Sequence, residues 1–244
     1  PGAGATGFEA LGEIINGSVN PSGKTVDTFV KDLTETPYYN NMGLNAYTNV
    51  EDLKEQIAAN DPAYEGSMGF VNYAEGIYVG YKFYETAAEE GLIKYEDMVQ
   101  YPFGYGLSYT EFEQKMGELE EKDGQISVDV EVTNTGDVAG KDVVEVYYKP
   151  PYTNGGIEKS SANLIEFAKT DLLQPGKSQI VTVTFSIEDM ASYDENNAKA
   201  YVLEKGDYVI SINSDSHTVL DQKTYTADKD VVYCLLYTSP SPRD

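Results

Sequence analysis

Residues 101–112, with the sequence YPFGYGLSYTEF, constrain the possible fold of this chain more than any other stretch. The two glycines can adopt backbone angles that are closed to other residues, and the aromatic rings around them can pack over a tight corner. Helical periods and glycine-rich turns precede this stretch, whereas alternating strands follow it. We therefore expect a rigid aromatic hinge between two differently built domains.

The part of the chain after the hinge has the pattern of a β-sandwich. Apolar and polar residues alternate over residues 126–133, as a half-buried strand requires. Further strands are expected at residues 144–148, 181–187 and 208–212. Short strands with regular turns predict two packed antiparallel sheets. The inward row of the sandwich is expected to contain Val128, Val130, Val183, Phe185 and Ile210.

The part before the hinge has a mixed pattern. A short helix is expected after residue 7, with Phe8, Leu11, Ile14 and Ile15 on one face. Residues 75–84 are aromatic and are expected to be extended.

One segment next to the hinge fits two structures. Phe112, Met116 and Leu119 fall at helical spacing, which by itself predicts a helix. The family resemblance described below instead implies the first strand of a sandwich here, and we expect the strand.

Charge and composition exclude several kinds of partner. The chain has 17 basic and 41 acidic residues, which give a net charge of -24. Such a surface repels phosphate, so we expect neither nucleic acid nor an anionic membrane as a partner. The sequence has no apolar run long enough to span a bilayer. The single cysteine, Cys234, excludes an intramolecular disulfide and is compatible with both cytoplasmic and secreted proteins.

Two glycine motifs resemble nucleotide-binding loops, but their contexts argue against that function. Residues 2–7 spell GxGxxG before a helix, yet no strand precedes them and the segment near Asp27 is a weak strand. Residues 22–25 resemble the end of a phosphate-binding loop, but the spacing from Gly17 to Gly23 is one residue too long.

His217, the only histidine, lies in a polar sequence and is expected to be solvated.

Four motifs in a fixed order resemble signatures of family 3 glycoside hydrolases, which are β-glucosidase-like enzymes. They lie at residues 20–24 (NPSGK), 75–81 (EGIYVGY), 101–112, and 132–140 (VTNTGDVAG) with EVYY at 145–148. The resemblance extends to about residue 232.

The resemblance implies an α/β part followed by an all-β part. Residues 1–107 are expected to be the C-terminal part of an α/β sandwich domain. Residues 108–227 are expected to form a fibronectin type III-like, immunoglobulin-like sandwich. Residues 228–244 would be a tail, of which 234–244 resembles the read-through of a sequencing adapter.

The same resemblance implies that the parent protein is a retaining, exo-acting β-glycosidase, with β-glucosidase favoured over β-xylosidase. Its substrate would be a neutral oligosaccharide or glycoside, without a metal or cofactor. Retaining enzymes use two carboxylates about 5 Å apart. The family places its nucleophile in a (β/α)8 barrel that is missing here, and its acid/base glutamate in a part expected to precede Pro1.

We therefore assign no catalytic, substrate-binding, cofactor or metal residue in this chain and expect it to be inactive alone, as a scaffold. Glu75 is a candidate acid, but a structural role, such as an ion pair with Lys82, is favoured. The alternative for the whole chain is a non-catalytic carbohydrate-binding, surface-binding or spacer module, because a fold does not fix a function.

Overall fold

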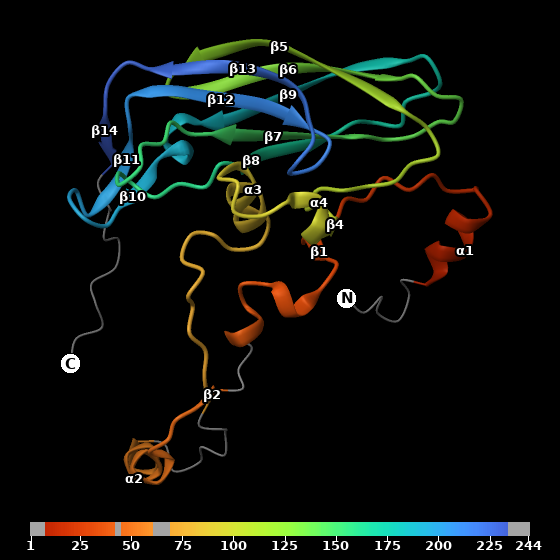
Figure 1. Cartoon of the computed structure of the whole chain (residues 1–244). Helices are drawn as coiled ribbons and strands as arrows, with labels where there is room; N and C mark the ends of the chain where they lie inside the picture. Colours follow the sequence, from red (N-terminus) through yellow and green to blue (C-terminus); the bar gives the residue numbers. More distant parts are fainter. Residues whose placement is uncertain (1–7, 42–44, 61–68, 234–244) are drawn as a thin grey trace.

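The computed structural model describes residues 8–41, 45–60 and 69–233 (Figure 1). The glycine motif at residues 2–7 and the predicted read-through tail at residues 234–244 lie outside these described residues.

Two antiparallel sheets dominate the structure after residue 110. One sheet has the order β5–β6–β9 and the other the order β13–β12–β7–β8. The strands of the first sheet are β5 (Phe112–Lys122), β6 (Gln125–Asn134) and β9 (Ser178–Ser186). Those of the second are β7 (Val143–Lys149), β8 (Asn163–Lys169), β12 (Gly206–Asn213) and β13 (Val219–Ala227). A smaller sheet contains β10 (Ser192–Asp194), β11 (Ala200–Leu203) and β14 (Val231–Tyr233), with the short helix η3 (Ile187–Met190) before it.

The core of the sandwich lies between the two large sheets and contains the predicted inward row. Val130 and Ile210 are fully buried, and Val128, Val183 and Phe185 are at most 4% exposed. Val128 pairs directly with Val183 across β6 and β9. Alternation in β6 and β9 therefore places their apolar side chains on one face of the sheet, as predicted.

The segment around Met116 is a strand, and a β-bulge explains its helix-like spacing. Met116 pairs with Val130 and Leu119 with Val128, so three steps on β5 match two steps on β6. A bulge adds one residue to one strand and shifts the later side chains to the other face. Gly117 lies in the bulge, where a Cβ atom would be 2.8 Å from the Asp129 carbonyl oxygen. Because of the extra residue, Met116 and Leu119 both pack against the core.

The part before residue 107 has short elements only. Its helices are α1 (Glu9–Ile15), α2 (Val50–Asn60), α3 (Tyr81–Glu89) and α4 (Tyr95–Met98), with the short helices η1 (Leu33–Glu35) and η2 (Tyr39–Asn41). Strand β1 (Phe29–Val30) pairs with β4 (Val99–Tyr101), and β2 (Asn45–Ala46) pairs with β3 (Gly69–Phe70). The described structure is therefore mostly β with few helices and fits a β-sandwich. The α/β assignment of residues 1–107 stays a prediction.

Two expectations for this part differ from the structure. The prediction that residues 75–84 are extended is wrong at both ends. Residues 75–77 form a turn in which the Tyr78 amide donates to the Glu75 carbonyl, and α3 begins at Tyr81, directly after Gly80 with a φ of 62°. The helix predicted after residue 7 is present as α1, but it has no buried residue, and Phe8 and Ile15 are exposed.

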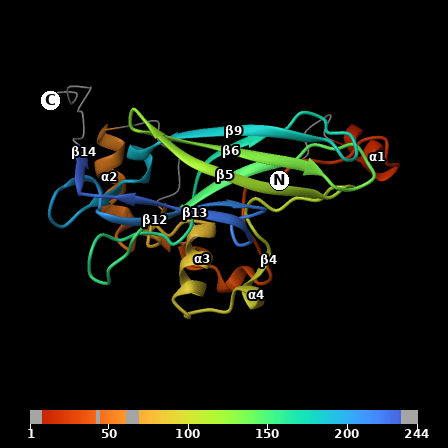
Figure 2. The same cartoon turned by 90° about the horizontal axis from the view of Figure 1, so that it is seen from above.

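Helices α3 and α4 lie against the outer face of the β13–β12–β7–β8 sheet, whereas α2 and β2 lie well away from it (Figure 1). Figure 2 shows the order of layers, from the β5–β6–β9 sheet through β12 and β13 to α3 and α4. A small second core, with Tyr84, Tyr95 and Val99 buried, lies between α3, α4 and β4.

Candidate functional site

The hinge at residues 101–112 is clamped by the segment around Lys24 and Thr25. The Thr25 amide donates to the Tyr105 carbonyl at 2.8 Å, and the Gly104 amide donates to the Thr25 carbonyl at 2.8 Å. The Thr25 hydroxyl adds a 2.6 Å bond to the Pro102 carbonyl. These bonds hold the hinge against the segment around Lys24 in the manner of a short strand pair.

Both hinge glycines are required by close contacts. Gly104 has a φ of 81°, and a Cβ atom there would overlap the Glu145 carboxylate. At Gly106 a Cβ atom would lie 2.9 Å from the Gly23 carbonyl oxygen. Glycine at these two positions thus lets the hinge touch the second sheet and the segment around Lys24.

A network of amide and hydroxyl groups connects the hinge to the sandwich. The Tyr109 amide donates to Asn20 Oδ1 at 2.8 Å, and Asn20 Nδ2 donates to the Ala139 carbonyl at 3.1 Å. Asn134 is fully buried, and its Oδ1 accepts a 2.7 Å bond from the Thr110 hydroxyl. Buried side-chain amides are stable only when they have such partners. Asn20 and Asn134 therefore join three of the four sequence motifs.

Glu145 is a buried carboxylate where the hinge, the segment around Lys24 and the sheet face of β7 meet, a region that we call the joint. Its residue is 3% exposed, and its Oε2 accepts a 2.9 Å bond from the Tyr147 hydroxyl. Lys24 Nζ lies 3.8 Å from Glu145 Oε1 and donates to the Ser214 carbonyl at 2.7 Å. Burial raises the pKa of Glu145 to about 7, although the Lys24 ammonium and the Tyr147 hydroxyl both oppose this increase.

Aromatic rings bring the 75–81 motif to the same place. The Tyr81 ring stacks on Phe103 with centroids 4.7 Å apart and meets Tyr147 edge to face at 6.2 Å. The Tyr81 hydroxyl also accepts a 2.9 Å bond from the Leu164 amide. Motifs that are far apart in the sequence thus meet at one joint, formed by the hinge, the segment around Lys24 and the sheet face of β7.

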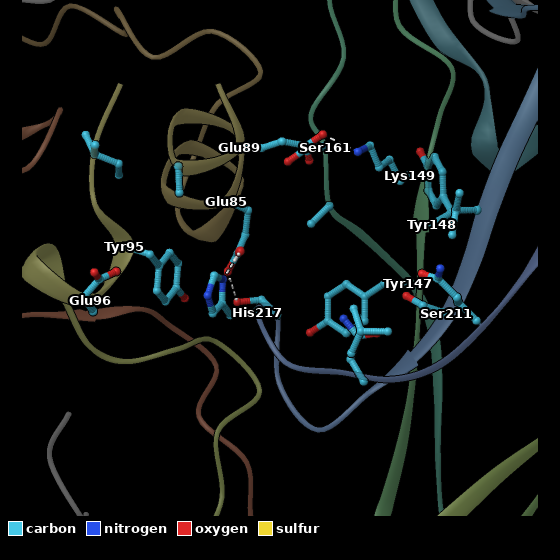
Figure 3. Close-up of a pocket in the computed structure, with 18 of the residues that line it drawn as sticks. Glu85, Glu89, Tyr95, Glu96, Tyr147, Tyr148, Lys149, Ser161, Ser211 and His217 are labelled. Carbon is cyan, nitrogen blue, oxygen red and sulfur yellow. Dashed lines mark hydrogen bonds and ion pairs between the residues drawn. The ribbon is translucent and has the colours of Figure 1, made fainter. Parts of the chain in front are cut away.

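A second cluster lies beside the joint, where the β12–β13 loop meets α3 and α4 (Figure 3). Glu85 of α3 accepts bonds from the Ser216 hydroxyl and from His217 Nδ1, each at 2.8 Å. The His217 ring stacks on Tyr95 of α4, with centroids 3.6 Å apart and planes within 4°. The Ser216 amide donates to the Phe103 carbonyl of the hinge at 2.8 Å.

The prediction that His217 is simply solvated is therefore wrong. Its side chain is 46% exposed, and the hydrogen bond to Glu85 raises its pKa, with smaller effects of the charges on Glu85, Asp215 and Glu96. Burial and the Glu85 charge raise the pKa of the Tyr95 hydroxyl. When His217 is protonated, its 2.8 Å contact with Glu85 is an ion pair that links α3 to the sandwich.

An open cleft of about 620 Å³ lies between α3, α4 and the outer face of the second sheet. Its walls include Glu85, Tyr95, Tyr147, Lys149 and His217. The Glu89 carboxylate forms an ion pair with Lys149 across this cleft. The Glu85 and Glu89 carboxylates thus accept bonds from side chains of the sandwich, an arrangement suited to holding the two parts of the chain together.

The structure does not support a catalytic role for Glu75. Glu75 is partly buried, and within the described residues its side chain has no hydrogen bond and no ion pair with Lys82, so the predicted pairing is wrong. Sequence reasoning also missed Glu85, Glu145 and His217. Glu145 had a usable signal, because it interrupts the apolar run of β7. Glu85 and His217 are 132 residues apart, and no spacing rule connects them.

The described residues hold no cluster of three or more histidine, cysteine, aspartate or glutamate side chains arranged to hold a metal ion. No helix in the same part of the chain is long and apolar enough to cross a membrane.

Comparison with known proteins shows that the chain is similar to parts of several β-glucosidases. Residues 142–216 match the family model of the fibronectin type III-like domain. Beta-glucosidase A of Butyrivibrio fibrisolvens is 35% identical over 94% of this chain. Beta-glucosidase 3B of Thermotoga neapolitana, solved with α-D-glucose, superposes with a TM-score of 0.73 at 29% identity over 93% of this chain. The GH3 β-glucosidase of Bifidobacterium adolescentis gives a TM-score of 0.70 at 27% identity over 91% of this chain.

The chain covers only part of each of these relatives. It spans 26% of the Butyrivibrio protein, 27% of the Thermotoga chain and 28% of the Bifidobacterium chain.

Proposed function

We propose that the protein is a β-glucosidase of glycoside hydrolase family 3. The observation that carries the proposal is the continuous match to Beta-glucosidase A along 94% of this chain. The substrate would be a neutral glycoside, which fits the bound glucose in the Thermotoga relative. No observation favours a non-catalytic binding or spacer module.

In this proposal, residues 1–107 belong to an α/β sandwich domain and residues 108–227 to a fibronectin type III-like domain. The role of the chain would be to hold these domains in a fixed orientation. The contacts of the joint support this role, since Asn20, Thr25 and Glu85 from the first part each bond to the hinge or the sandwich.

The proposed reaction is a two-step displacement with retention, which needs two carboxylates about 5 Å apart on either side of the scissile bond. The two glutamates that are buried in the described part of the chain serve other purposes. Glu85 accepts bonds from Ser216 and His217, and Glu145 accepts a bond from Tyr147. We therefore assign neither of them to catalysis, and both catalytic carboxylates would come from a barrel domain and from other parts of the protein.

The test compares this chain with the full-length protein on aryl β-glucosides and aryl β-xylosides. We expect turnover by the full-length protein, with β-glucosides favoured, and none by the chain alone, because in this proposal neither of the two required carboxylates lies within the chain. A Glu75→Gln variant of the chain is the matched control. Turnover that co-purifies with the chain and disappears in this variant would overturn the proposed scaffold role.

A further inference from the structure

Lys82 differs from every other lysine of the chain. Among the residues that the structure describes, it is the only partly buried lysine that has neither a hydrogen bond nor an ion pair. The other lysines that are not exposed are each close to a carboxylate, namely Lys24, Lys159 and Lys223. The ammonium group of Lys82 thus loses part of its hydration without an anion to replace it.

The position of Lys82 in α3 disfavours its ammonium form further. It is the second residue of the helix, whose first turn contains no acidic residue and whose N-cap, Gly80, supplies no side-chain bond. The amide groups at a helix N-terminus carry a partial positive charge, which disfavours an ammonium there. The carboxylates further along α3 are already taken, Glu85 by Ser216 and His217, and Glu89 by Lys149. In agreement with this environment, burial lowers the pKa of Lys82.

Lys82 lines a cleft that has room for a small ligand. The cleft has a volume of about 600 Å³, and its walls include Tyr78, Tyr148, Asn163, Tyr193 and Tyr201. This volume is within the usual range of about 300–1,000 Å³ for small-molecule sites. Tyrosine rings and an amide offer apolar faces beside hydrogen-bonding groups, a combination that suits a neutral hydroxylated molecule.

Anionic ligands fit this cleft less well. Four carboxylates are also part of its lining, and they would repel a second negative charge. They belong to Glu75, Glu158, Asp194 and Glu195. The other lysine in the lining, Lys159, is paired with Glu204. A neutral electrophile can approach the amine without that penalty.

We propose that Lys82 is an imine-forming lysine that reacts with a small neutral hydroxyaldehyde, such as an open-chain sugar, in this cleft. A lysine whose ammonium form is disfavoured is the type of side chain that forms Schiff bases with carbonyl compounds. The neutral amine attacks the aldehyde carbon, and the nitrogen lone pair forms the new C–N bond. The carbonyl oxygen then leaves as water with the two amine hydrogens, and an imine remains. This site does not depend on the proposed β-glucosidase function.

The test is a competition among the lysines of the unmodified full chain. The protein is incubated with glycolaldehyde and sodium cyanoborohydride, which reduces the imine to a stable secondary amine, and labelled peptides are quantified by mass spectrometry. Lys122 is the internal reference, because it is exposed and also lacks a bonding partner within the described residues. We expect Lys82 to be labelled several-fold faster than Lys122 near neutral pH. Equal or slower labelling of Lys82 would overturn the proposal.

Two further measurements test the cause of the reactivity. The labelling rate of Lys82 should reach its midpoint at a lower pH than that of Lys122, and urea should remove the difference. Coinciding midpoints in the folded protein would contradict the proposal. A Lys82→Arg variant should lose the adduct at this position while its circular dichroism melt stays the same, which identifies the labelled peptide.

Discussion

The sandwich and the joint are stabilised by different chemistry. In the sandwich, apolar side chains such as Ile126, Val144 and Ile212 are fully buried between two sheets. In the joint, the contacts are made by glutamates, a histidine, side-chain amides and tyrosines, and the accompanying apolar core is small. The stability of the sandwich therefore depends on the apolar area that folding removes from water. The stability of the joint depends on the protonation of its side chains and on hydrogen-bond geometry.

The largest effect should come from a charge placed in the sandwich core. Val130→Asp buries a carboxylate at a fully buried position, and we expect it to lower the free energy of unfolding by about 3 kcal/mol or more. Thr184→Asp is the matched control, since Thr184 points to solvent on β9 and faces Ser127, whose hydroxyl can donate to the new carboxylate. Urea melts of both variants measure the difference. Equal losses would mean that the two faces of the sheet are not distinct.

The next effect concerns the joint and depends on pH. The folded pKa of Glu145 is raised from 4.5 to about 7, so the unfolded chain ionises first as pH increases. The contribution of Glu145 is fully present below pH 4.5 and is lost as pH rises through about 7. Glu145→Gln removes this titration, and the stability of wild type relative to the variant should fall by about 2 kcal/mol between pH 4.5 and 8. A constant difference in urea melts across this range would contradict the buried position of the carboxylate.

A third comparison separates backbone strain from steric overlap. Gly104 and Gly124 have similar φ angles of 81° and 78°, but only at Gly104 would a Cβ atom meet another group, the Glu145 carboxylate. Both Gly→Ala substitutions should cost about 1 kcal/mol for the left-handed backbone. Gly104→Ala should cost about 1 kcal/mol more, because the buried carboxylate must move. If chemical denaturation gives the same loss for both variants, the hinge does not press on Glu145.

The smallest expected effect on stability comes from the ion pair between His217 and Glu85. The pKa of the histidine is raised by Glu85, so the stabilisation from this pair is present below about pH 6.5 and is lost as pH rises through the folded pKa of His217. Glu85→Gln should bring that pKa back toward its ordinary value. Because the chain has one histidine, a proton NMR titration of the imidazole follows this site without overlap. An unchanged midpoint in the variant would rule out the ion pair.

The sequence predicted the sandwich better than the joint, for physical reasons. Period-two alternation depends on the strand alone, so Val128 and Val183 could be assigned to the core before their pairing was known. The spacing of Met116 and Leu119 was ambiguous, because a bulge moves one side chain by a single residue and imitates a helical period. The hydrogen bond between Glu85 and His217 depends on how two separate segments of the chain pack together. Local sequence patterns cannot predict such packing.

The close approach of Gly104 and Glu145 has a consequence for evolution. The space that a side chain at position 104 would fill is occupied by the carboxylate from position 145, so neither position is free to change alone. A relative with a larger residue at the first position would need a shorter one at the second. The two positions should therefore covary among homologues, and a Gly104→Ala chain should regain stability when Glu145→Asp or Glu145→Ser is added.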